Sequence, residues 1–168
     1  MKFLREHWFH IAGFLLVGLL IFMLFFKNSY DISQLQVILI YAFMALLAHQ
    51  IEEFVFPGGG AIFLNKGQWK EQKNFNRYPC NMQTGVVINV IAWGFYITAI
   101  VFPQFIWLGL GVILIGFGEL IAHTFIWNKG MKTWYNPGLA TTIFLLVPVS
   151  SYYIYFISTN HLVANIDW

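Results

Sequence analysis

The sequence has few charged residues. Only 10% of its 168 residues are charged, and 59% are hydrophobic, whereas an average soluble protein has roughly 25% charged residues. This shortage of charge excludes an ordinary soluble domain and indicates an integral, multi-pass membrane protein. At this length we expect a single membrane domain, residues 1–168, which must itself carry the function.

Two further shortages exclude other classes of protein. The net charge is only +2 and no dense block of Lys and Arg occurs, so we expect no nucleic-acid partner. Cys80 is the one cysteine, which excludes an internal disulfide and a thiolate metal cluster.

Long apolar runs are what the sequence has in abundance. About 20 apolar residues span a bilayer as a helix, and the pattern predicts an all-α bundle of five transmembrane helices. The first run is too long for a signal peptide and is predicted to stay attached. The loop 57–83 is expected to lie at the membrane interface. The predicted spans are 8–26, 35–56, 84–102, 104–127 and 138–158.

The basic residues predict the orientation. Of nine Lys and Arg residues, only Lys27 falls on one side of the predicted bundle. Because basic residues favour the cytoplasmic side, we expect a cytoplasmic N-terminus and a C-terminus outside, in the cell (inner) membrane and surrounded by membrane lipids. The others are Lys2, Arg5, Lys66, Lys70, Lys73, Arg77, Lys129 and Lys132.

Three carboxylates lie inside predicted spans. They are Glu52 and Glu53 in the second span and Glu119 in the fourth, and His49 and His123 lie one helical turn away. A charged side chain in the bilayer centre costs about 2.5–3.5 kcal/mol on insertion scales, so such residues usually have a function. The spacings i, i+3 and i+4 place each set on one helix face.

These polar residues share one depth. Glu53 and His49 lie roughly 6 and 12 Å from the cytoplasmic end of their helix, and His123 and Glu119 roughly 7 and 13 Å from the end of theirs. Facing helices can build a carboxylate and histidine metal site in this way. We therefore predict that these four residues bind a divalent metal, Zn, Fe or Mn.

Five other polar residues are expected to support this site. Glu52 is predicted to act as general base or as a further ligand, and Asn89 or Tyr135 to orient the substrate. His10 and Asn136 are predicted to hydrogen-bond to the ligands.

Three segments carry a resemblance to a known family. The stretches HQIEEFVFPGG, GELIAHTF and WYNPGLATT resemble segments of the HXXEE-motif family of integral membrane proteins, over residues 35–145. The family has no assigned activity, so the resemblance implies a set of residues and no mechanism. That set is His49, Glu52, Glu53, Glu119, His123 and Asn136.

The leading hypothesis is a metal-dependent membrane enzyme, hydrolase-like, that acts on a lipid or another apolar small molecule in the cytoplasmic half of the bilayer. Metal-activated water attacking an ester or amide needs only these groups. One alternative is a metal-free isomerase that uses Glu and His as acid and base on an isoprenoid- or sterol-like substrate. Another is a small proton- or ion-coupled transporter or ion-binding protein, for which a homo-oligomer would supply the missing symmetry.

Overall fold

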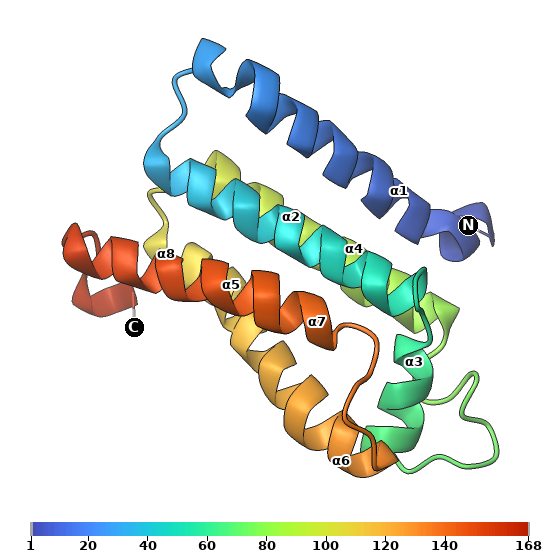
Figure 1. Cartoon of the computed structure of the whole chain (residues 1–168). Helices are drawn as coiled ribbons and strands as arrows, with labels where there is room; N and C mark the ends of the chain where they lie inside the picture. Colours follow the sequence, from blue (N-terminus) through green and yellow to red (C-terminus); the bar gives the residue numbers. More distant parts are fainter. Residues whose placement is uncertain (1, 168) are drawn as a thin grey trace.

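The computed structural model describes residues 2–167 and is helical without strands over that range. Five of its helical segments are long and apolar enough to cross a membrane, as predicted. Each begins and ends within a few residues of the predicted bounds, and Figure 1 shows them running roughly side by side. They span Phe3–Ser29, Gln34–Phe54, Met82–Val101, Ile106–Met131 and Leu139–Thr159.

Several of these segments change helix type along their length. Wide π-helical turns, which often occur at functional sites, interrupt the first, fourth and fifth. The elements are α1 (Lys2–Ile21), η1 (Phe22–Phe26) and η2 (Lys27–Ser29), then α2 (Gln34–Phe54) and α4 (Met82–Val101), then α5 (Ile106–Ile121), η4 (Ala122–Trp127) and α6 (Asn128–Met131), and finally α7 (Leu139–Thr141), η5 (Thr142–Leu146) and α8 (Val147–Thr159).

Helix α2 forms the centre of the bundle. It contacts α1, α4 and α8. Of its most apolar stretch, 72% is buried inside the protein, against 11% for the first segment. Its start is fixed by a capping box, in which Ser33 and Gln36 each satisfy a backbone N–H of the other. The polar residues near the other end of α2, from His49 to Glu53, are also buried inside the protein.

Glycines bring α5 close to α8. Gly109 and Gly116 face α8, and a Cβ on Gly109 would overlap the Tyr153 hydroxyl. Gly111 and Gly118 lie on another side of α5, where an added Cβ would have no atom within 4 Å. Only the first pair therefore serves helix packing.

The long loop after α2 is ordered by one buried amide. The loop begins with α3 (Gly60–Phe63) and η3 (Leu64–Gln68). Asn65 donates to the carbonyls of Phe75 and Cys80, both at 2.7 Å, and accepts from the Cys80 N–H at 2.8 Å. These bonds hold the far end of the loop against its beginning.

The same loop docks on the end of the fourth segment. Gly67 and Gly130 approach so closely that a Cβ on Gly130 would overlap the Gly67 backbone. The Trp127 indole donates to the Gln68 side chain at 3.1 Å. The loop therefore covers the end of the bundle at which α2 stops and α7 begins.

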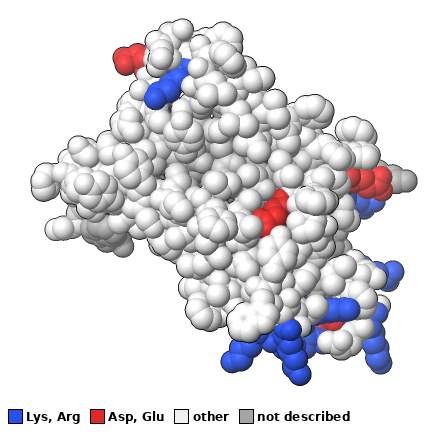
Figure 2. All heavy atoms as spheres, in the orientation of Figure 1, with Lys and Arg blue, Asp and Glu red and all other residues white. Residues whose placement is uncertain are grey.

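The two ends of the bundle differ in charge. The N-terminus lies at the end that carries α3 and α6, and the C-terminus at the opposite end (Figure 1). Lys and Arg atoms gather at the α3 and α6 end, while most of the remaining visible surface is uncharged (Figure 2).

Candidate functional site

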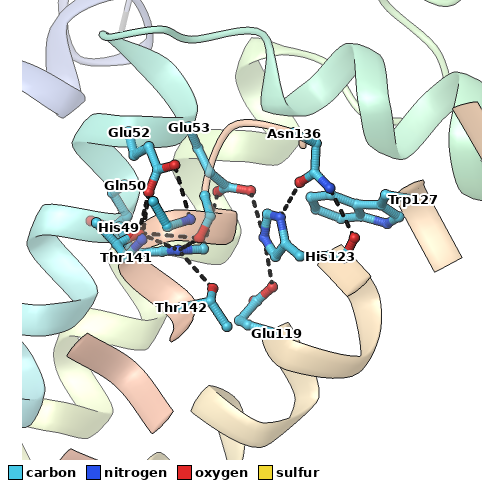
Figure 3. A network of polar contacts seen from close by, with 12 residues as sticks. His49, Gln50, Glu52, Glu53, Glu119, His123, Trp127, Asn136, Thr141 and Thr142 are labelled. Atoms are coloured by element: carbon cyan, nitrogen blue, oxygen red, sulfur yellow. Dashed lines mark hydrogen bonds and ion pairs between the residues drawn. The ribbon is translucent and has the colours of Figure 1, made fainter. Parts of the chain in front are cut away.

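The four predicted metal ligands converge at the α3 and α6 end of the bundle. His49 and Glu53 come from α2, Glu119 from α5 and His123 from the π-helical turn η4 (Figure 3). The two imidazole rings meet edge to face, with centroids 5.1 Å apart. Both histidines are buried, with 2% and 0% of their surface exposed.

The imidazole of His49 is oriented by the start of the fifth segment. Its Nδ1 lies 3.1 Å from the Gly138 carbonyl and 3.1 Å from the Thr141 hydroxyl. A carbonyl only accepts hydrogen bonds, so Nδ1 carries the hydrogen. In the neutral ring, Nε2 therefore has a free lone pair, and it is buried without a hydrogen-bond partner among the described residues.

The imidazole of His123 is oriented in the same way. Its Nδ1 contacts the Asn136 side-chain oxygen. The Asn136 amide nitrogen donates to the His123 carbonyl at 2.8 Å and to the Asn128 side-chain oxygen at 2.7 Å, which fixes the amide orientation. The Asn136 oxygen must accept, so His123 Nδ1 is the donor. Its Nε2 is likewise buried without a hydrogen-bond partner among the described residues.

Two carboxylates face these nitrogen atoms. The Glu53 oxygens lie 3.7 Å from His49 Nε2 and 3.5 Å from His123 Nε2. A Glu119 oxygen lies 3.5 Å from His123 Nε2. One ligand atom each from His49, Glu53 and His123 fall within 4.8 Å of one another (Figure 3).

These separations of 3.5–3.7 Å exceed the 2.7–3.2 Å range of hydrogen bonds to nitrogen. Ligand atoms around a tetrahedral metal with bonds of about 2.0–2.2 Å lie about 3.3–3.6 Å apart. Lone pairs on nitrogen and carboxylate oxygen repel one another, and a cation between them, either a metal ion or a proton, would relieve this repulsion.

Gly138 lies against both imidazoles. Its φ is +99°, a backbone conformation that residues with a side chain rarely adopt. A Cβ added at this position would lie 2.7 Å from His49 Cε1 and 2.8 Å from His123 Nε2. Glycine therefore allows the fifth segment to start between the two rings.

Glu52 points away from this group, toward the start of the fifth segment. Its carboxylate accepts from the backbone N–H groups of Ala140 and Thr141, at 3.2 and 2.8 Å, and from the Thr141 hydroxyl at 2.6 Å. The Tyr135 hydroxyl also donates to it at 2.7 Å, and burial and this bond raise the pKa of Tyr135 to about 12. Glu52 therefore caps a helix N-terminus, and both of its oxygens are engaged there instead of facing His49 and His123.

Substitution of Glu52 by Gln is expected to lower the free energy of unfolding by about 1–2 kcal/mol, because it removes the anion from a helix N-terminus. Chemical denaturation in detergent measures this. Glu71→Gln is the matched control, because Glu71 also accepts from two backbone N–H groups, at 2.7 and 2.9 Å, but in an exposed loop. Unchanged stability of Glu52→Gln would contradict the capping role.

A family model described as a protein of unknown function with an HXXEE motif matches residues 40–153. The chain belongs to this HXXEE family. Searches of curated proteins and of solved structures found no match. The geometry divides the HXXEE motif of this chain into two parts. His49 and Glu53 face His123, while Glu52 caps the fifth segment.

Beside the HXXEE motif, a second polar chain links α2 to α4. The Gln50 amide donates to Asn89 at 2.8 Å and accepts from the Trp93 indole at 2.8 Å. Gln50 is fully buried, and its place next to His49 in an apolar span was the signal that could have identified it. His10 lies apart from the site, exposed on α1 and stacked against His7.

A pocket of about 340 Å³ adjoins the site formed by His49, Glu53, Glu119 and His123. Glu53, Glu119 and Asn89 lie in its wall, and most of the remaining lining is apolar. Ile88 in this wall is 60% exposed on the outer face of α4. Cys80 also lines the pocket, and burial raises the pKa of its thiol, which disfavours a thiolate ligand or nucleophile.

Proposed function

We propose that the protein is a metal-dependent membrane enzyme, hydrolase-like, that acts on a lipid or another apolar substrate. One observation supports this most strongly. Two buried imidazoles have their Nδ1 hydrogens fixed by other groups, and both direct a free Nε2 at the same carboxylate. Hydrogen-bonded Nδ1 and free Nε2 are typical of metal-ligating histidines.

The metal is held by His49, Glu53 and His123, and Glu119 is the fourth candidate ligand. Two neutral imidazoles and two carboxylates balance the charge of one divalent ion. Mixed nitrogen and oxygen ligands suit Zn, Fe or Mn. Such an ion activates water and polarises a carbonyl group.

Glu119 is also placed to accept a proton from that water. Its side chain is 30% exposed, against 12% for Glu53, and it lines the adjoining pocket. Glu52 was predicted for this role from the sequence, but its oxygens bind the start of the fifth segment. Asn89, in the pocket wall, is the residue that orients the substrate.

The substrate is apolar because the pocket is. Phe54, Leu64, Ile88 and Ile115 line it, and three segments of membrane-spanning length contribute to its lining. The basic residues at this end support a cytoplasmic location for the pocket in the cell membrane, with the C-terminus outside. The substrate then enters from the inner leaflet.

Substitution of Gly118 by Leu is expected to lower kcat/KM for a lipid substrate by roughly tenfold or more, because it fills a hydrophobic pocket. Gly118 lines the pocket, and its Cβ would meet no atom within 4 Å. Gly111→Leu is the control, since Gly111 lies two helical turns earlier in equally open space and outside the pocket. Equal activity of both variants would contradict the assignment of this pocket.

Hydrolysis of fluorogenic lipid esters and amides by the purified protein in nanodiscs tests the proposed chemistry. We expect activity that a chelator removes and that one of Zn, Fe or Mn restores. Metal-loaded protein that hydrolyses none of these substrates would contradict the hydrolase assignment. Activity that survives complete metal removal would favour acid–base chemistry by Glu and His.

A further inference from the structure

A second pocket, of about 550 Å³, lies beside α6 and shares no lining residue with the first. Its lining includes Lys129 and Lys132 as well as Leu139 and Ile143. The pocket therefore combines basic and apolar side chains. The function proposed above makes no use of it.

The two lysines of this pocket are available to an anion. Both are exposed, and no carboxylate of residues 2–167 forms an ion pair with either. Two other cations of the same end are engaged within the loop. Lys70 donates to the Gly67 carbonyl at 2.6 Å, and Lys66 lies 3.5 Å above the Phe75 ring.

The pocket lies where a membrane surface is expected. It sits at the end of the fourth segment, which finishes at Met131. Trp134 in its rim is 97% exposed, as in the aromatic belts of membrane interfaces. Ile143 lies farther along the fifth segment and is 42% exposed toward its outer face.

We propose that this pocket binds an anionic phospholipid, with the phosphate at Lys129 and Lys132 and the acyl chain along Leu139 and Ile143. The negative charge of the phosphate is complementary to the two lysines. A free inorganic anion would leave the apolar side chains of the pocket unused. The lipid is a bound component of the interface and is independent of any reaction at His49 and His123.

Native mass spectrometry of the full chain in detergent tests this, with phosphatidylglycerol and phosphatidylcholine of equal chain length. We expect tighter binding of phosphatidylglycerol. Lys129→Gln/Lys132→Gln is expected to weaken it by about 30-fold, at about 1 kcal/mol for each basic residue.

Lys66→Gln/Lys73→Gln is the control, because it removes the same charge from the same end outside the pocket. Equal weakening by both double variants would show diffuse attraction and overturn the site. So would equal binding of the two lipids. Displacement of the lipid by millimolar inorganic phosphate would show a soluble anion site instead of a lipid site.

Discussion

Substitution of Gly138 by Ala is expected to abolish metal binding at His49 and His123. The new Cβ would lie 2.7 Å from His49 Cε1 and 2.8 Å from His123 Nε2, so both rings must move or the fifth segment must withdraw. Loss of a hydrogen-bond partner of a metal ligand alone lowers metal affinity by about 10–100-fold. Displacement of two ligands should reach or exceed about 100-fold. Competition with a fluorescent chelator measures the affinity.

Backbone strain must be separated from this contact. Alanine in the left-handed region costs roughly 1–2 kcal/mol. Gly59→Ala provides the control, because Gly59 also has a positive φ of +93° but its Cβ would meet no atom within 4 Å. We expect Gly59→Ala to lose similar stability and to keep its metal. Equal loss of metal in both variants would contradict the role of Gly138 as a spacer between the imidazoles.

Substitution of Asn136 by Leu should have the second largest effect. It leaves the His123 Nδ1 hydrogen, the His123 carbonyl and the Asn128 side-chain oxygen without their partner. An unsatisfied buried polar group costs about 1–3 kcal/mol, so thermal melting should show a large loss of stability. The ring of His123 is also freed to rotate, and metal affinity is expected to fall by about 10–100-fold.

Asn136→Asp separates these two effects. The Asp carboxylate still accepts from His123 Nδ1, but it cannot donate to the His123 carbonyl or to Asn128. We therefore expect lower stability with metal affinity near that of the wild type. A variant that binds metal as poorly as Asn136→Leu would contradict the orienting role of the Asn136 oxygen.

The fold and much of the site follow from the sequence. The five spans were predicted because a bilayer demands long apolar helices, and the structure has five such segments. His49, Glu53, Glu119 and His123 were predicted to meet because helical spacing and a shared depth restrict where they can lie. The structure brings these four side chains together.

The remaining features depend on helix rotation and on contacts between distant segments. His10 was predicted to lie near the ligands from its depth in the membrane alone. This was wrong, because His10 is exposed on α1. Glu52 precedes Glu53 in the sequence, yet it turns toward Thr141 in the fifth segment. The position of Gly138 between the two imidazoles could not be predicted, because no sequence pattern shows which side chains approach a glycine.

Elemental analysis of the purified protein tests the central claim most directly. Wild-type protein and His10→Ala are expected to carry about one equivalent of Zn, Fe or Mn per chain. His49→Ala and His123→Ala, folded to the same extent by thermal melting, are expected to retain at least roughly tenfold less. A folded wild-type protein without stoichiometric metal, or His49→Ala and His123→Ala variants with the same metal content as wild type, would contradict the metal site.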